Sequence, residues 1–140
     1  MRFKEVDYQR RGLQLRCGLT FYLRCLNGRT VDACFKGPCF AAASDIPLEK
    51  VEDSTVMLRR QIGHNYKNFQ YGCPITWSEY GGLTVCWKEA YVSVDATEAD
   101  LARIVEFIED FLEEVREHKN AVTRRQAWNS RFTHASRTAR

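Results

Sequence analysis

Long apolar runs are missing from this chain of 140 residues. No stretch approaches the roughly 18 to 20 consecutive apolar residues that a membrane-spanning helix needs. Residues 1–7 are charged throughout and offer no apolar core for a signal peptide. We therefore expect a cytoplasmic protein that does not associate with membranes.

Motifs that mark catalysis or cofactor binding are also missing. The sequence has no phosphate loop, no dinucleotide fingerprint, no nucleophile elbow and no paired-histidine metal motif. The candidate nucleophiles are Cys39 and Cys73, which lie near Gly/Pro turns, and His64 is the candidate base. Their positions in the sequence do not show that these side chains lie together in space. Since no catalytic or cofactor motif is found, we expect no catalytic residues, no cofactor and no enzymatic activity.

The six cysteines lack the spacing of a metal site, since no Cys-x2-Cys pair occurs and no His-x3–5-His pair accompanies them. A zinc site would have to be assembled from Cys34, Cys39, His64, Cys73 and Cys86. Most of the cysteines instead lie in apolar, strand-like runs, where a reduced thiol behaves as a small hydrophobe. The absence of an Asn-x-Ser/Thr acceptor adds no sign of secretion. We expect reduced structural thiols and no metal ion.

The first half of the chain predicts antiparallel strands. Residues 13–26 alternate as a strand does, with Gly18 as a bulge or break. Asn27-Gly28 is a strong hairpin signal, and residues 29–35 supply the partner strand. The sequence therefore predicts a hairpin centred on Asn27-Gly28.

The register of this hairpin decides which residues share a face. A two-residue turn pairs Leu26 with Arg29 and places Phe21 opposite Cys34. One face then carries Phe21, Leu23 and Cys25, and the other carries Tyr22, Val31, Ala33 and Phe35 with Arg24 and Arg29 among them. Because neither face is purely polar, we expect the hairpin to be covered on both sides or to lie at an interface.

The rest of the chain completes an α+β fold. Its segments predict a loop or short helix at 44–53, a strand at 55–62, a surface loop at 64–72, a second hairpin at 75–87 and a short strand at 91–94. We expect an antiparallel sheet of about five to six strands, with one long C-terminal amphipathic helix packed across it.

That helix starts near Asp95 or Thr97, because Thr97-x-x-Asp100 approximates a capping box. At 100° per residue its apolar residues fall on an arc about 160° wide. They are Leu101, Ile104, Val105, Phe107, Ile108, Phe111, Leu112, Val115 and Val122. Packing on one surface needs only about 100°. We therefore predict a homodimer with Phe107 and Phe111 at its interface.

The opposite face of the helix is acidic and contains two i,i+4 ladders of like charge. The ladders are Glu106, Asp110 and Glu114, and Glu109, Glu113 and Glu117. Each like-charge pair destabilises a helix by about 0.2–0.5 kcal/mol, and acids near a helix C-terminus also oppose the helix dipole. Because a local rule broken this consistently often marks function, we predict that these six acids bind a cationic protein surface.

Only basic charges follow the acidic stretch. The chain carries a net charge of +3, and its last cations are Lys119, Arg124, Arg125, Arg131, Arg137 and Arg140. We expect a single α+β domain at 1–122 and a basic tail at 123–140 that is frayed and partly disordered.

These features favour a small interaction protein of the inhibitor, immunity or adaptor type, which binds a protein partner through the helix and an aromatic surface. The alternative is binding of a nucleotide or nucleic acid, with bases stacked on aromatic faces. The residues predicted for it are Arg59, Arg60, Trp77, Trp87, Arg124 and Arg125. A third possibility is that the acidic face is only solvated.

Overall fold

The computed structural model describes residues 12–25, 27–63 and 72–138. Within residues 120–138 it describes the backbone and the side chain of Trp128. The elements are β1 (Gly12–Gln14), β2 (Thr20–Cys25), β3 (Thr30–Gly37), β4 (Phe40–Pro47), α2 (Leu48–Gln61), β5 (Ile75–Ser78), β6 (Gly82–Trp87), β7 (Ala90–Val94) and α3 (Glu98–Thr138).

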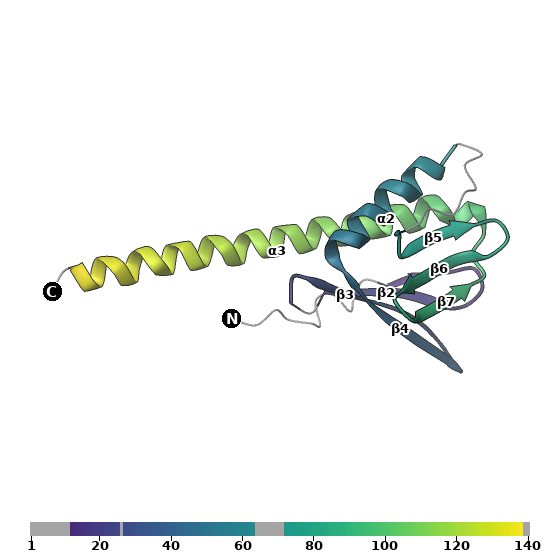
Figure 1. The fold of residues 1–140 in the computed structure, drawn as a ribbon, viewed down its shortest axis with the longest axis horizontal. Helices are drawn as coiled ribbons and strands as arrows, with labels where there is room; N and C mark the ends of the chain where they lie inside the picture. Colours follow the sequence, from purple (N-terminus) through teal and green to yellow (C-terminus); the bar gives the residue numbers. More distant parts are fainter. Residues whose placement is uncertain (1–11, 26, 64–71, 139–140) are drawn as a thin grey trace.

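The described strands form two antiparallel sheets, ordered β1-β2-β3-β4 and β5-β6-β7 (Figure 1). This confirms the predicted α+β fold with antiparallel strands and a long C-terminal helix. The strands number seven in two sheets, where about five or six in one sheet were expected. The difference has a simple cause, because α2 follows β4 and separates the two sets of strands along the chain.

The predicted strand at 13–26 is divided into β1 and β2 by a turn. Gly18 lies in this turn with a φ of +95°, and its N–H donates to the carbonyl oxygen of Leu15 at 3.0 Å. A positive φ is readily adopted by glycine alone. Gly18 is therefore a break between two paired strands.

The hairpin of β2 and β3 is confirmed, but its predicted register is wrong by one residue. Phe21 pairs with Phe35 and not with Cys34. The inward positions of both strands then coincide, and the shared face carries Phe21, Leu23, Cys25, Val31, Ala33 and Phe35, all of them buried. A shift of one residue moves a strand's whole apolar set to the other face, so burial selects this register. The expectation of two mixed faces is wrong.

The turn between β2 and β3 shows why a two-residue loop was the wrong assumption. The side-chain oxygen of Asn27 accepts hydrogen bonds from the N–H groups of Arg29, at 2.9 Å, and Thr30, at 3.0 Å. Gly28 adopts a φ of +77°. Asn side chains often form such local turns with the backbone ahead of them, and this one lengthens the loop.

The predicted strand at 55–62 is wrong, because this segment belongs to helix α2. Buried Val51, Thr55 and Leu58 are spaced by four and three residues, which is a helical period. The Thr55 hydroxyl donates to the carbonyl oxygen of Val51 at 2.9 Å, so the helix accommodates this β-branched residue. The expected loop or short helix at 44–53 is shared between β4 and α2.

The second half of the chain largely follows the prediction. The hairpin expected at 75–87 is formed by β5 and β6, and β7 corresponds to the strand expected at 91–94. The surface loop expected at 64–72 falls on residues 64–71, which lie outside the described part of the chain.

Helix α3 begins at a small network around the buried carboxylate of Asp100. The Thr97 hydroxyl donates to this carboxylate at 3.2 Å, and the N–H of Asp100 donates to the Thr97 carbonyl at 3.0 Å. Arg103 lies 3.0 Å and Arg16 3.5 Å from the same carboxylate. The predicted Thr97–Asp100 contact is present, although the hydroxyl does not accept the backbone N–H of a complete capping box.

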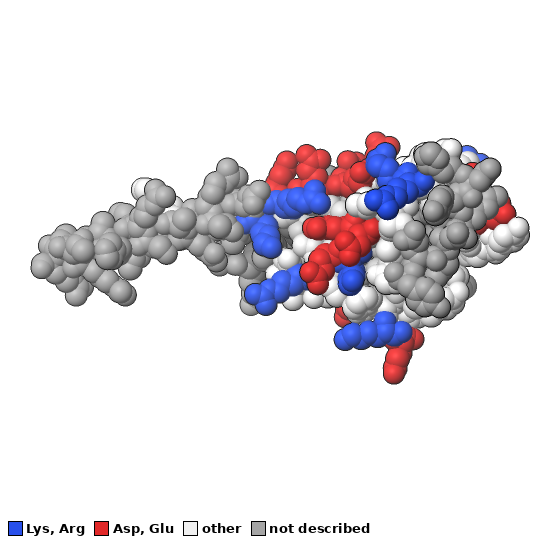
Figure 2. Space-filling view, turned by 45° about the horizontal axis from the view of Figure 1, so that its top comes forward, with Lys and Arg blue, Asp and Glu red and all other residues white. Residues whose placement is uncertain are grey.

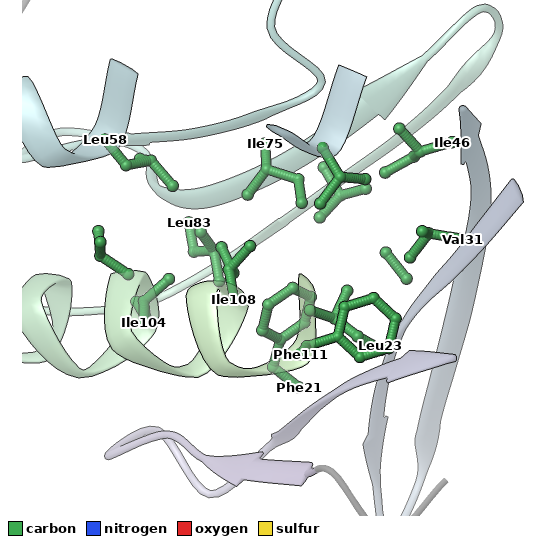
Figure 3. Close-up of a cluster of buried hydrophobic side chains, with 14 of the residues drawn as sticks. Phe21, Leu23, Val31, Ile46, Leu58, Ile75, Leu83, Ile104, Ile108 and Phe111 are labelled. Carbon is green, nitrogen blue, oxygen red and sulfur yellow. The ribbon is translucent and has the colours of Figure 1, made fainter. Parts of the chain in front are cut away.

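The core lies between α3, α2 and the two sheets. Figure 3 shows side chains of α3 meeting α2 and β6 on one side and β2 on another. Those labelled are Phe21, Leu23, Val31, Ile46, Leu58, Ile75, Leu83, Ile104, Ile108 and Phe111. Contact with more than one surface accounts for the width of the apolar arc of α3.

This packing changes the predicted dimer surface. The side chain of Phe111 is 0% exposed, so its use at a dimer interface is wrong. Phe107 is half-buried, and its ring centroid lies 5.7 Å from that of Phe21. Both rings therefore contribute to the core of one chain, and a homodimer formed in another way stays a prediction.

The backbone of α3 does not end near residue 122 but continues to Thr138. From Lys119 this part rises about 30 Å at 1.5 Å per residue, and it projects beyond both sheets (Figure 1). The division into a domain and a basic tail at residue 122 stays a prediction, with the backbone of 123–138 now described as helical.

Candidate functional site

Four acidic side chains of α3 line a shallow hollow on the surface, and we call them the acidic face. They are Asp110, Glu113, Glu114 and Glu117. Acidic side chains gather over the middle of the molecule, with Lys and Arg side chains near them (Figure 2). Buried Phe111, Leu112 and Val115 alternate with these acids along α3, so core packing holds the acidic face in place.

Glu109 was predicted to belong to this surface, but it forms an ion pair with α2. Arg59 donates to both carboxylate oxygens of Glu109, with its Nε 3.1 Å from Oε2. This hydrogen bond and the charge of Glu109 raise the pKa of the Arg59 guanidinium, and Glu106 adds to the effect. The ladder is therefore partly compensated at Glu109 by a cation from α2.

Three other acids of the ladders, unlike Glu109, have no ion pair among the described residues. Asp110, Glu113 and Glu117 are exposed, and the part of the chain that the structure describes supplies no ion pair to them. Arg116, on the same helix, lies 3.9 Å from Glu52 of α2 instead. Negative charge therefore accumulates at one patch of α3.

Most of the basic residues further along α3 lie well beyond the acidic face. A straight helix rises 1.5 Å per residue, which places Arg124 about 16 Å along the axis from Glu113. Exposed charges are largely screened beyond about 8–10 Å at ordinary ionic strength. The nearest of them in the chain are Lys119, which is exposed, and Arg124, about 10 Å along the axis from Glu117.

The predicted conflict with the helix dipole is wrong. The dipole acts within the last turn of a helix, and α3 ends at Thr138. Glu113 and Glu117 therefore lie in the interior of the helix. The repulsion within the ladders remains as the cost of these acids.

The alternative ligand-binding residues are not brought together as a stacking surface. Trp77 is 5% exposed, and its indole N–H donates to the carbonyl oxygen of Ala96 at 2.8 Å. Trp87 packs partly buried against the core, and Arg59 is held by Glu109. Arg60 is exposed on α2, and the side chains of Arg124 and Arg125 lie outside the description. The prediction of Trp77 as a face for a base is wrong.

A second hollow, which the predicted hairpin register did not indicate, lies on the outer face of the β1–β4 sheet. It is lined by Tyr22, Arg24, Asp32, Cys34 and Lys36. Arg24 pairs with Asp32 at 3.1 Å, and the ammonium of Lys36 lies 5.9 Å from the centroid of the Tyr22 ring. The correct register would have revealed this polar set, since all five positions then share one face. Asp32 offsets the charge of Arg24, and Lys36 leaves the hollow with one net positive charge.

The thiol of Cys73, one of the two candidate nucleophiles, has a raised pKa. Burial raises the pKa of Cys73, and the nearby charge of Asp53 raises it further. Burial likewise raises the pKa of Cys25 and of Cys34. A catalytic thiol needs a lowered pKa, and the candidate base His64 lies outside the described residues. Among those that are described, no group of three His, Cys, Asp or Glu side chains could hold a metal ion.

We expect alkylation to distinguish the six thiols, which are all free. At neutral pH the exposed Cys17 and Cys39 should react first. Cys25, which is buried and has a raised pKa, should react at least about 10-fold more slowly than either. Mass spectrometry of timed samples measures this order. Preferential labelling of Cys73 would contradict it and would indicate an activated thiol.

Comparison with protein-family models, with curated proteins and with solved structures finds no match to this chain. No helix in the described part of the chain, α3 included, combines the length and apolarity needed to cross a membrane. The acidic face gathers four carboxylates in one hollow, which makes it the candidate functional surface.

Proposed function

We propose that this chain is a small, non-enzymatic interaction protein of the inhibitor, immunity or adaptor type. Its acidic face binds a cationic surface of a protein partner. The observation that carries the proposal is the exposed set of Asp110, Glu113 and Glu117, to which the described residues supply no ion pair.

The cost of these acids supports a role in binding. Four like-charge i,i+4 pairs occur between Glu106 and Glu117, each destabilising the helix by about 0.2–0.5 kcal/mol. Neutral Gln at the same positions would keep the helix without this cost, because Gln and Glu have similar helix propensities. A cationic partner would convert the repulsion into attraction and would increase the association rate.

The packing beneath the acidic face also supports binding. Phe111 and Val115 are 0% exposed beneath it, so the backbone that presents the acids is already ordered. A surface organised before binding loses less conformational entropy on association. The same negative charge would repel the phosphates of a nucleic acid, which favours a protein partner at this face.

The cysteines support a cytoplasmic location for this function. All six thiols are free, and Cys25 is fully buried as a small apolar side chain. Reduced thiols persist where glutathione and thioredoxin maintain them. We therefore place the proposed interaction in the cytoplasm.

The triple variant Asp110→Asn, Glu113→Gln and Glu117→Gln tests the proposal. We expect at least a 10-fold loss of partner capture from lysate, measured by quantitative mass spectrometry. We also expect the free energy of unfolding to rise by about 1 kcal/mol, because the variant relieves repulsion within the helix. Urea denaturation measures the second effect and shows that the variant is folded.

A matched control removes three acids elsewhere, by Glu49→Gln, Asp53→Asn and Glu89→Gln. All three side chains are exposed and lie outside α3, so capture should be unchanged. If the triple variant of the acidic face captures the same proteins as the wild type, these acids are only solvated and the proposal fails.

A further inference from the structure

Helix α3 is one continuous helix with two halves of opposite charge. The acidic half, residues 98–117, contains eight Asp and Glu against Arg103 and Arg116. The basic half, residues 119–138, contains Lys119 and four arginines and no acid. The acidic and basic charges are thus held in two consecutive segments of one helix axis.

The two halves differ in how the fold supports them. The acidic half is packed through Ile104, Ile108 and Phe111 into the core. None of the described strands, nor α2, lies alongside the far part of the basic half (Figure 1). Most helices in water owe their stability to packing of one face, so a partner surface is expected along residues 119–138.

We propose that this partner is a second copy of the chain, with the basic half of one α3 lying antiparallel on the acidic face of the other. The inference rests on the proposed role of the acidic face and identifies the cationic surface that it binds. A twofold axis between residues 118 and 119 brings the position of Glu113 level with that of Arg124 in the second copy. It brings Glu106 level with Arg131, and the symmetry repeats each pairing.

Charge selects the antiparallel arrangement over the parallel one. Parallel helices in register would place acid beside acid and base beside base, which disfavours that pairing. An antiparallel pair places the acidic half of each helix beside the basic half of the other, along a helix about 60 Å long. Within one chain the same neutralisation is prevented, because a straight helix holds its two halves apart. The pairing also leaves Phe107 and Phe111 in the core, where the fold places them.

Two charge-reversal variants of the full chain test this pairing. The acid-reversed variant carries Glu113→Arg and Glu117→Arg, and the base-reversed variant carries Arg124→Glu and Arg125→Glu. Sedimentation velocity at low salt should show a wild-type dimer and at least a 10-fold weaker self-association for each variant alone. An equimolar mixture of the two should form dimers again, because both contacts then join opposite charges.

Further measurements separate charge pairing from other effects. A chain with all four reversals should dimerise as the wild type does, and circular dichroism checks that each variant is folded. High salt should weaken the wild-type dimer at least 10-fold, because exposed charges are screened. The control Glu49→Arg with Glu89→Arg, two exposed sites outside α3, should not change the dimer.

The outcomes distinguish this inference from the proposed function. A concentration-independent wild-type monomer, or no recovery in the mixture, overturns the pairing. If the wild type is monomeric but neutralising the acidic face still abolishes capture of another protein, only the pairing fails. If dimers form as described while capture is unaffected by neutralisation, the role in binding other proteins fails. Nucleic acid that co-purifies with the wild type and is released by the base-reversed variant overturns the pairing in favour of a nucleic-acid partner.

Discussion

Replacing Phe111 with alanine should lower the free energy of unfolding by about 3–5 kcal/mol. Domains of this size are stable by about 5–15 kcal/mol, so the loss removes a large part of the total. The side chain is 0% exposed and lies with Phe21 and Leu23 of β2 in the core (Figure 3). Truncation would leave a cavity where α3 meets this strand. Urea denaturation followed by circular dichroism measures the change.

Phe107→Ala is the matched control for Phe111→Ala, since both rings belong to the apolar arc. Phe107 is only half-buried, so its truncation should cost less, about 1–2 kcal/mol. Suppose that Phe111→Ala lowers the free energy of unfolding no more than Phe107→Ala does, and also weakens self-association. That result would contradict this packing. It would instead support a dimer interface at Phe111.

Periodicity predicted the helix that contains Phe111, but it could not assign the surfaces that the helix contacts. Nine apolar residues on one arc were enough to identify the amphipathic helix. The width of the arc had two explanations, a second copy or a second surface of the same chain. The choice depends on the position of α2, and the helix in α2 was hidden by its β-branched residues Val51 and Thr55.

The register of the β2–β3 hairpin shows a different limit. Alternation placed the right residues in strands, but the turn length decides the pairing. That length depends on one side chain, Asn27, which bonds to the backbone of Arg29 and Thr30. The polar hollow on the outer sheet face could not be predicted without it. An apolar set shared by Phe21, Leu23, Val31 and Phe35 was the available clue.

The candidate site was predicted in part. Spacing along the helix is enough to place Asp110, Glu113 and Glu117 on one face, and the structure finds them exposed there. The pairing of Arg59 with Glu109 joins residues 50 positions apart in the chain, and it depends on how α2 packs on α3. The basic residues are held along the same axis as the acids because α3 continues to Thr138. The apolar periodicity did not indicate that the helix extends so far.

Replacing Gly82 with alanine should lower the free energy of unfolding by about 2–4 kcal/mol. Gly82 has a φ of +67°, and an added Cβ would collide with the Val94 carbonyl oxygen and the Ala96 nitrogen. The backbone strain contributes about 1–2 kcal/mol, and overpacking commonly adds about 1–3 kcal/mol. Both colliding atoms belong to the backbone that joins β7 to α3, so neither can move aside as a flexible side chain could.

Gly81 provides the matched control for Gly82, because it is the adjacent residue and is exposed. A Cβ at Gly81 would meet only the Ser78 hydroxyl, at 3.1 Å, so Gly81→Ala should change stability by less than about 0.5 kcal/mol. Urea denaturation of both variants measures the difference, and equal losses would contradict the close packing of β6 on the link to α3. The Ala96 carbonyl also accepts the indole N–H of Trp77. Displacement of this link by Gly82→Ala should therefore change the tryptophan fluorescence of the folded protein, whereas Gly81→Ala should leave it unchanged.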